Sequence, residues 1–415
     1  MSTTILHNAQ LIDGTGGDPV ADAVVIVEDG RIAWAGASAD APEVDASNNP
    51  VKVDLGGNTI TPGFFDVHVH LSLPGPKGGS KALLQEAMVP PSFRYFEIAK
   101  RLETTLAAGV TTVRDLMGTD TGVRLASQHG LINGPRVLVA DKMLSQTGGH
   151  ADWHVASGLD GATLVGGELV DTIDEARKAA RELLRTHVDV IKIASSGGVT
   201  SMNDDPTWVG MRTEMVAAIV EEGENYGGVP VAAHAIGNGG IRAAVEGGVR
   251  SVEHGYELDD DLRQQMVKNG QFLVPTLLET IHPDTATPQA AAKSEKWHAM
   301  AHESVKASVA AGIKIAAGTD AGLVPDHGEN LGELPLLVEY GGMTPMQAIV
   351  AGTKTSAELC GLDYILGTIE AGKIADIVVV AGDPLADISA VADNDKILLV
   401  MRDGKPAINR GRFSF

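Results

Sequence analysis

The protein has 415 residues, and its 54 acidic and 32 basic side chains give a formal net charge of −22. This acidic balance argues against nucleic acids and anionic membrane surfaces as partners, because both attract basic patches. The 44% of hydrophobic residues excludes a wholly disordered chain, and the single cysteine, Cys360, excludes an internal disulfide and a zinc site of several thiolates.

The N-terminal sequence contains neither a basic region nor an apolar stretch of the length found in signal peptides. No uninterrupted apolar run approaches the roughly 18 residues of a membrane span. We therefore expect a soluble, cytoplasmic protein that does not bind membranes.

The two ends of the chain share a pattern of short, β-branched runs. Near the N-terminus these are ILHNAQLID, AVVIVEDGRIAWAGA and VKVDLGG, and near the C-terminus they are ADIVVVAGD and KILLVMRDGKPAI. The Asp-Gly pairs predict hairpin turns, because both residues tolerate left-handed backbone conformations. We expect the ends to pair into one small β domain, residues 1–59 plus 362–415, beside a second domain over 60–361.

The middle of the chain alternates between apolar strands and helix-like segments. Segments such as IDEARKAARELLRTHV place apolar residues three or four apart, which is typical of amphipathic helices. Such alternation predicts parallel strands joined by right-handed crossovers, and eight units favour a closed (β/α)8 barrel over an open sheet. The eight predicted strands are residues 64–70, 110–115, 136–141, 190–195, 229–234, 251–255, 272–277 and 313–320.

The first predicted strand contains His68 and His70. Residues i and i+2 of a strand point to the same face, so both imidazoles would project into the mouth of the barrel. Barrel enzymes place their chemistry at this carboxyl-terminal face. Alone the pair is a weak signal, because two ordinary histidines give the same pattern.

Lys192 lies in the fourth predicted strand, within VIKIAS. An ammonium among Val, Ile and Ala is costly to bury unless it is paired. The pattern alone favours a lysine that reaches the rim or pairs with Asp189. The alternative is a lysine whose lowered pKa exposes a neutral amine, which reacts with carbon dioxide to form an anionic carbamate able to bridge two metals.

Three further polar residues end predicted strands, namely His234 in VPVAAH, His254 in SVEHG and Asp320 in IAAGTD. Each alone is explained as a satisfied polar residue at a strand end. Together with Lys192 and the two histidines of the first strand, they would converge at one end of one barrel. Imidazole and carboxylate ligands of this kind suit zinc, with manganese, cobalt and iron as alternatives.

With these residues in place, the sequence resembles the amidohydrolase superfamily, in particular its binuclear branch with a carboxylated lysine. The resemblance covers nearly the whole chain and implies a distorted (β/α)8 TIM barrel with a small β-sandwich domain built from both chain termini. The matching motifs are ITPGFFDVHVH, AGVTTVRD, SQTGGHAD, IKIASSGGV, AAHAIG, SVEHG, AAGTDAG and GTIEAGKIADIVVVAGDPL.

The resemblance also implies which residues bind metal. His68, His70 and Asp320 would hold a buried ion, and His234 and His254 a more exposed one. The expected cofactors are therefore two divalent metal ions, with zinc as the expected metal.

Lys192 and Asp320 would have further roles in this scheme. Lys192, as N6-carboxylysine, would bridge the two ions together with a hydroxide that attacks the substrate. Asp320 would take the proton from the attacking water and pass it to the leaving amine.

Within the superfamily, SQTGGHAD and the IKIASSGG strand resemble the group of Xaa-Pro dipeptidases, Xaa-Arg and Xaa-Lys carboxypeptidases and ochratoxin-hydrolysing amidases. His150, in TGGH, matches the residue that polarises the substrate carbonyl or steadies the tetrahedral intermediate; the plainer alternative is a loop histidine in a glycine turn. Ile236 is a predicted substrate contact, but it departs from the aromatic residue that several proline dipeptidases have there, which contacts the substrate carboxylate. Proline specificity therefore does not transfer.

The expected reaction is hydrolysis of the amide bond of a dipeptide or N-acyl amino acid, including ochratoxin-type amides, and the relatives imply a homo-oligomer. A cyclic amide, carbamate or urea substrate, as for the more distant imidazolonepropionases, remains an alternative. Deaminases are disfavoured because they generally lack the lysine of strand four. A non-catalytic scaffold is disfavoured because all six ligand positions are intact.

Softer candidates lie on loops after the strands. Trp153 and Tyr256 are predicted substrate contacts, although packing explains each equally well. The turn-rich segment 71–94 is expected to form a lid or an interface. Further pocket-lining candidates with the same two explanations are His154, Met202 and Trp208.

Two other groups of polar residues are expected to be structural. Arg114 and Asp115 end the second predicted strand and are expected to form an ion pair. His282, His298 and His302 lie in or near a helical region, where packing or solvent exposure is expected.

Overall fold

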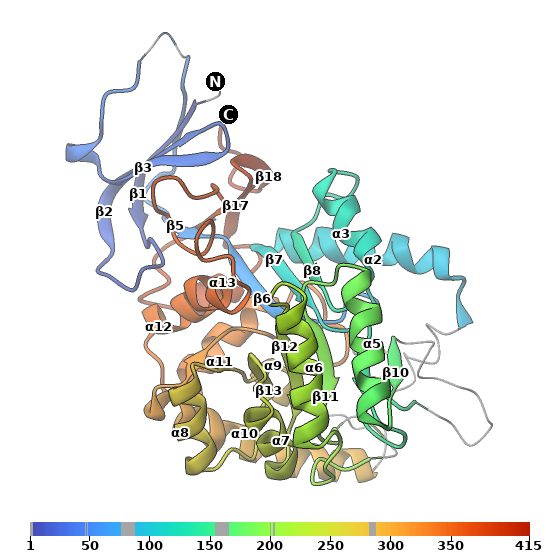
Figure 1. The fold of residues 1–415 in the computed structure, drawn as a ribbon. Coiled ribbons are helices and arrows are strands. Elements are labelled where there is room, and N and C mark those ends of the chain that lie inside the picture. The colour runs from blue at the N-terminus through green and yellow to red at the C-terminus, as the bar shows by residue number, and fades with distance from the viewer. Residues whose placement is uncertain are drawn as a thin grey trace.

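The computed structural model describes residues 3–45, 47, 49–75, 88–153, 166–199, 201, 204–281 and 288–415, with residues 288–290 described by their backbone alone. Within these ranges the chain forms an α/β structure with one mixed sheet and two parallel sheets (Figure 1). None of the described helices is both long and apolar enough to cross a bilayer.

Both ends of the chain contribute strands to the mixed sheet. Its order is β18-β17-β16-β5-β1-β2-β3, with β4 beside β1, and the two chain ends lie close together (Figure 1). The ends meet where β5 pairs antiparallel with β16, so the expected pairing of the terminal segments is confirmed. The strands are β1 (Thr3–Leu11), β2 (Val20–Glu28), β3 (Arg31–Ala37), β4 (Val51–Asp54), β5 (Thr59–Pro62), β16 (Ile377–Val380), β17 (Ile397–Arg402) and β18 (Lys405–Asn409).

The two predicted Asp-Gly turns are present in this sheet. Asp29 and Gly30 connect β2 to β3 with φ values of 46° and 83°, and Asp403 and Gly404 connect β17 to β18 with 52° and 73°. Positive φ at both central residues is the geometry that a two-residue hairpin turn needs to match the strand twist. This requirement explains why Asp-Gly occurs at both positions.

The middle of the chain forms the parallel sheets, of order β6-β7-β8 and β10-β9-β11-β12-β13-β14-β15. Backbone hydrogen bonds join the sheets on both sides, because Val67 N–H donates to Ala317 O (3.0 Å) and Asp189 N–H to Val139 O (2.9 Å). The carboxyl ends of these strands therefore lie together. The strands are β6 (Phe64–Val69), β7 (Val110–Asp115), β8 (Arg136–Val139), β9 (Met143–Ser145), β10 (Gly167–Leu169), β11 (Ile191–Ala194), β12 (Val231–Ala235), β13 (Ser251–His254), β14 (Phe272–Val274) and β15 (Lys314–Ile315).

Three of the eight predicted strands differ from expectation. The seventh ends at Val274, and Leu277 already begins a short helix. The third ends at Val139, and after a bend at Asp141 (φ 65°) the chain continues as β9, which pairs with β11. The strands β9 and β10 were missed, because three-residue strands show no measurable alternation. The eighth is only two residues long, and the rest of its predicted range is held by hydrogen bonds such as Asp320 N–H to His68 O (2.8 Å).

Helices connect and cover the parallel strands. Helix α5 begins with a capping box of Thr172 and Glu175 and buries Ala176, Ala180 and Leu183, as the apolar spacing predicts. The helices are α2 (Pro91–Ala107), α3 (Thr121–Gln128), α5 (Ile173–Arg185), α6 (Thr213–Asn225), α7 (Asn238–Glu246), α8 (Asp260–Asn269), α9 (Leu277–Thr280), α10 (Pro288–Ala311), α11 (Glu333–Glu339), α12 (Pro345–Val350), α13 (Ser356–Leu359) and α14 (Ser389–Ala392), with the short 3₁₀ helices η1 (Ser38–Asp40) and η4 (Asn330–Gly332) and the π-helix η5 (Ala351–Thr355).

Arg136 links the parallel strands to the terminal sheet. Its guanidinium lies 2.9 Å from the buried carboxylate of Asp376 and 2.8 Å from Asp403. Asp376 precedes β16, and its side chain is 3% exposed. A buried carboxylate of this kind depends on its cation, because water cannot replace the lost charge.

Replacing Arg136 with Met should lower the free energy of unfolding by about 2–4 kcal/mol, because it leaves Asp376 buried without its cation. Chemical denaturation of both proteins measures the change. Lys100→Met is the matched control, since Lys100 is 77% exposed and its pair with Glu103 should contribute less than about 1 kcal/mol. Equal effects of the two variants would contradict a structural role for the Arg136 link.

Candidate metal centre

Six predicted ligand residues come together where the parallel strands end. Their side chains are buried, with residue exposures between 1% and 5%. Asp320 Oδ1 lies 3.0 Å from His70 Nε2 and 3.6 Å from His68 Nε2, and the rings of His234 and His254 are 4.6 Å apart. The six residues are His68 on β6, His70 just after it, Lys192 on β11, His234 on β12, His254 at the end of β13 and Asp320 after β15.

The backbone is strained at two of these positions. His254 has a φ of 72° and Asp320 a φ of 63°, in the left-handed region that residues other than glycine rarely adopt. Such conformations cost about 1–3 kcal/mol each and cluster at functional sites. The strand ends are therefore held in a conformation that local preference alone would not select.

The arrangement of these donors fits a divalent metal. His68, His254 and Asp320 offer ligand atoms that all lie within 4.8 Å of one another. Asp320 Oδ1 has no well-formed hydrogen bond although two imidazole nitrogens lie close to it, so this buried oxygen is left for another partner. Nitrogen and carboxylate donors converging in this way suit zinc.

His68, His234 and His254 are in the protonation state that metal binding needs. Burial, reinforced by the nearby charge of Lys192, holds the pKa of His68 well below its usual range. Burial likewise lowers the pKa of His254 to about 3 and that of His234 well below its ordinary value. Neutral imidazoles offer a free lone pair, which is the form that coordinates a metal.

A buried carboxylate orients His68. Glu253 Oε2 lies 3.0 Å from His68 Nδ1, and Arg114 Nη2 donates to Glu253 Oε1 at 2.9 Å. With Nδ1 facing a carboxylate, the other ring nitrogen is directed towards Asp320 and Lys192. Outer partners of this kind fix the ring orientation of metal-binding histidines.

The predicted ion pair between Arg114 and Asp115 is wrong. Consecutive residues of a strand point to opposite faces, so Arg114 reaches Glu253 while Asp115 accepts the backbone N–H groups of Leu71 (2.6 Å) and Met117 (3.2 Å). Arg114 therefore stabilises Glu253, the carboxylate that contacts His68, instead of pairing with Asp115.

A second group of polar residues orients His254. Its Nδ1 lies 2.7 Å from Thr276 Oγ1, and the carboxylate of Glu279 lies 3.7 Å away. The predicted substrate contact Tyr256 is 2% exposed, and its hydroxyl donates to Glu279 at 3.2 Å. In this structure Tyr256 packs behind His254.

Lys192 is buried at the centre without a carboxylate ion pair among the described residues. Its Nζ lies 3.4 Å from His68 Nε2, and burial lowers its pKa to about 8. Asp189, the partner that the sequence pattern favoured, pairs instead with Arg124 at 2.7 Å. The interpretation of Lys192 as a simple structural ion pair with Asp189 is therefore wrong.

His150 lies against the centre, on the loop after β9. Its ring stacks on that of His234, with centroids 3.9 Å apart and 12° between the planes. Its Nδ1 lies 3.1 Å from Asp204 Oδ2. A Cβ added at Gly198 would lie 2.0 Å from His150 Cε1, so only glycine leaves room for the ring. Asp204 was not predicted, since nothing in the sequence distinguishes it from the adjacent Asp205.

The remaining pocket candidates have different surroundings. Trp153 is half-buried 6.3 Å from the His150 ring, and its buried Nε1 has no hydrogen-bond partner among the described residues. Ile236 is 1% exposed within the apolar core, whereas Trp208 is 57% exposed. Candidates outside the described residues are His154, Met202, His282 and positions 76–87 of the segment 71–94.

His298 and His302 have the expected packing role. His298 is 8% exposed, and the ring of His302 stacks on Tyr340 at 3.7 Å. His302 also lies within hydrogen-bond distance of Thr280, at 2.9 Å.

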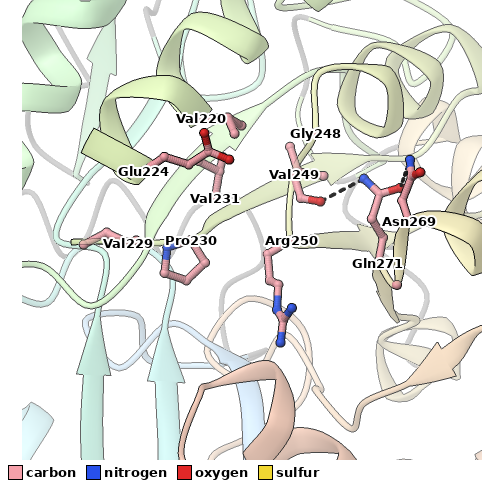
Figure 2. Close-up of a pocket in the computed structure, with 12 residues that line it drawn as sticks. Val220, Glu224, Val229, Pro230, Val231, Gly248, Val249, Arg250, Asn269 and Gln271 are labelled. Atoms are coloured by element: carbon pink, nitrogen blue, oxygen red, sulfur yellow. Dashed lines mark hydrogen bonds between the residues drawn. The ribbon is translucent and has the colours of Figure 1, made fainter. Parts of the chain in front are cut away.

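A pocket of about 320 Å³ lies at the opposite, amino-terminal ends of β12, β13 and β14 (Figure 2). Arg250, which lines this pocket, already has partners within the protein. It lies over the ring of Phe272 at 4.7 Å and donates to the carbonyl of Glu358 at 3.0 Å. Gln271 donates to Val249 O at 2.8 Å. No histidine, lysine or cysteine is among its described lining residues, so the carboxyl-terminal end is the better candidate site.

After treatment with a chelator, the metal-free protein should bind added zinc at the six-residue centre. His254→Ala should remove a ligand and lower the bound zinc, whereas Glu253→Gln should weaken zinc binding by about 10–100-fold, because His68 loses its orienting carboxylate. Metal analysis and competition with a chromophoric chelator measure both effects. His302→Ala is the control with unchanged zinc, and equal zinc binding by all four proteins would contradict the assignment.

Comparison with known proteins agrees with this geometry. Residues 59–407 match the model of the amidohydrolase family. The chain is 30% identical to ochratoxinase of Aspergillus niger over 97% of this chain and 86% of the relative. It is 26% identical to imidazolonepropionase of a Geobacillus species, over 94% and 91% of the two chains.

Solved structures agree as well. A prolidase complexed with N-methylphosphonate-L-proline has a TM-score of 0.88 and 31% identity, over 98% of this chain and 99% of the other. The match to the family model and the similarity over nearly full lengths identify this chain as a member of the amidohydrolase family, hydrolases that act on carbon–nitrogen bonds.

Proposed function

We propose that this protein hydrolyses the amide bond of a dipeptide or an N-acyl amino acid, with two zinc ions as cofactors. The observation that carries the proposal is the convergence of six buried ligand residues beside His150. The relatives support the substrate class, since one is an ochratoxinase and another is a prolidase that binds a phosphonate derivative of proline. Ile236 is where several proline dipeptidases have an aromatic residue, so proline is not assumed as the leaving group.

The proposed ligands form two sets. One ion is assigned to His68, His70 and Asp320, and the other to His234 and His254. The separation of 4.6 Å between the rings of His234 and His254, and the 3.0 Å between His70 Nε2 and Asp320 Oδ1, support these sets. The group of His68, His254 and Asp320, whose ligand atoms lie within 4.8 Å of one another, takes members from both sets, so the two ions would lie close together. Bound zinc polarises a carbonyl and lowers the pKa of water to about 7.

Lys192 is assigned as N6-carboxylysine that bridges the two sets. Its burial, its lack of an ion-pair partner among the described residues and its 3.4 Å approach to His68 support this assignment. Carbamate formation would replace the buried ammonium of Lys192 with an anionic group that has two oxygen atoms, which can bind metal ions. This assignment therefore resolves the cost of the buried ammonium.

We assign the proton transfer to Asp320, and we assign contact with the substrate carbonyl to His150. Asp320 would accept a proton from the attacking water and deliver it to the leaving nitrogen, which its position among the ligands allows. His150 would donate a hydrogen bond to the carbonyl oxygen as negative charge develops there. Trp153, whose Nε1 has no hydrogen-bond partner among the described residues, is the better candidate for a substrate contact, and Tyr256 would act through His254.

We also propose that the two parallel sheets form one distorted (β/α)8 barrel over residues 60–361, beside a β-sandwich domain of residues 1–59 and 362–415. The hydrogen bonds that join β6 to the segment after β15 support a closed arrangement. Closure explains how ligands from β6, β11, β12 and β13 reach one centre.

Hydrolysis of a cyclic amide is the second candidate, because the similarity to imidazolonepropionase extends over 94% of this chain. The same residues would act on either carbonyl. Assaying ring-opening of cyclic amides beside a library of dipeptides and N-acyl amino acids separates the two functions.

The zinc-loaded protein should release free amino acid from at least one member of the acyclic library, detected by mass spectrometry. Lys192→Ala should reduce turnover by at least about 100-fold, and short-chain carboxylic acids should restore part of it if a carbamate is the native ligand. Lys178→Ala, on the exposed face of α5, is the control with unchanged turnover. No turnover of any acyclic amide by the metal-loaded wild type would refute the proposed function.

A further inference from the structure

A buried carboxylate that the proposed reaction does not use lies on β6, two residues before His68. We propose that Asp66 is a positioning residue, which holds Asp320 in its left-handed backbone conformation through Thr319 and so places the Asp320 carboxylate for metal binding. This proposal rests on the proposed function, in which Asp320 is a metal ligand.

The carboxylate of Asp66 is 1% exposed, and no lysine or arginine of the described residues pairs with it. It accepts four hydrogen bonds instead, from the backbone N–H groups of His68 (3.1 Å) and Thr319 (3.2 Å), the hydroxyl of Thr319 (2.6 Å) and the amide of Asn330 (2.7 Å). Gly328 N–H donates to Asn330 Oδ1 at 2.8 Å, so the amide nitrogen must face the carboxylate. Both oxygens of Asp66 therefore face donors only, which suits a group that only accepts.

The hydroxyl of Thr319 extends this contact across Asp320. Its oxygen donates to Asp66 and accepts the backbone N–H of Ala321 at 3.1 Å. The residues on both sides of Asp320 are therefore tied to one buried carboxylate, Thr319 directly and Ala321 through the hydroxyl. Asp320 has a φ of 63°, which residues other than glycine adopt only where their surroundings hold them.

Backbone contacts place the same segment against β6. Asp320 N–H donates to His68 O at 2.8 Å, and His70 N–H donates to Ala321 O at 2.8 Å. A Cβ added at Gly318 would lie 2.8 Å from His68 Cβ, so the segment lies directly against the strand. These contacts set where the segment lies, whereas the Thr319 hydroxyl is the side-chain group that bridges the turn at Asp320.

The consequence concerns the ligand geometry. Asp320 Oδ1 lies 3.0 Å from His70 Nε2 and 3.6 Å from His68 Nε2. If the backbone of Asp320 relaxed, its carboxylate would move away from these nitrogens. Loss of a partner that orients a ligand typically weakens metal binding by about 10–100-fold. The network should therefore affect metal affinity and ligand geometry as well as stability.

Thr319→Val and Thr319→Ser form the matched pair that tests this role. Valine has nearly the size of threonine but no hydroxyl, so it removes the bonds to Asp66 and Ala321, whereas serine can keep both. We expect Thr319→Val to weaken zinc binding by about 10–100-fold and Thr319→Ser by less than about threefold, measured by competition with a chromophoric chelator. Equal zinc affinities of the two variants would overturn the proposal.

A second readout separates positioning from simple stabilisation. The visible absorption of bound cobalt(II) depends on the number and geometry of its ligands, so the metal-free proteins are loaded with cobalt. Thr319→Val should change the spectrum of the wild type, and Thr319→Ser should reproduce it. A Thr319→Val protein that is less stable but has the wild-type cobalt spectrum would show a purely structural role and overturn the proposal.

Glu222→Gln is the control for lost stability. Glu222 is 3% exposed on α6, and it pairs with Arg177 and Arg181 of α5. Its replacement should lower the free energy of unfolding, because two guanidinium groups lose their buried partner, and should leave the cobalt spectrum unchanged. A spectrum altered as much as in Thr319→Val would mean that instability alone disturbs the centre, which overturns the proposal.

Asp66→Asn tests the carboxylate itself, because the amide nitrogen of asparagine would face a hydrogen-bond donor at one end. We expect zinc binding about 10-fold weaker than in the wild type, and an unchanged affinity would overturn the role of Asp66. If this variant does not fold, the two Thr319 variants decide the proposal. A wild type that binds neither zinc nor cobalt would refute the proposed metal centre and its function, whereas equal Thr319 variants in a zinc-binding protein overturn this proposal alone.

Discussion

The structure depends on the burial of many nitrogen and oxygen donors at the carboxyl ends of one set of parallel strands. Removing such groups from water costs roughly 1–3 kcal/mol for each one left unpaired, and more for a charge. Polar contacts around the donors offset part of that cost. Glu253, which pairs with Arg114, contacts His68, and Thr276 contacts His254. The remainder, centred on Asp320 Oδ1 and Lys192, is what a metal pair and a carbamate would satisfy.

The same constraint explains features far from the centre. Strand ends must place side chains towards one another, and His254 and Asp320 adopt left-handed backbone conformations to do so. Hydrogen bonds such as Asp320 N–H to His68 O hold those conformations against their intrinsic cost. These hydrogen bonds therefore hold the strand ends in backbone conformations that local preference alone would not select.

Features that follow from local geometry could be predicted from the sequence. The i, i+2 spacing of His68 and His70 predicts side chains on one face, and the strand-end positions of His254 and Asp320 predict a shared edge. The Asp-Gly hairpins were predicted for the same reason, since a two-residue turn is specified by the residues that compose it.

Contacts across long sequence separations could not be predicted. The bend at Asp141, which divides one expected strand into β8 and β9, depends on a single φ value. Arg114 was assigned to its neighbour, while its actual partner, Glu253, is more than 130 residues away. Asp204 was missed because only the folded chain brings its carboxylate to His150, which lies more than 50 residues earlier.

The most direct test of the central claim is a crystal structure of the zinc-loaded protein with anomalous diffraction measured at the zinc edge. We expect two anomalous peaks, one among His68, His70 and Asp320 and one beside His234 and His254, at about 2.0–2.2 Å from their ligand atoms. Density for a carboxyl group on Lys192 should extend towards both peaks. An unmodified Lys192 and no zinc within coordination distance of these residues would contradict it.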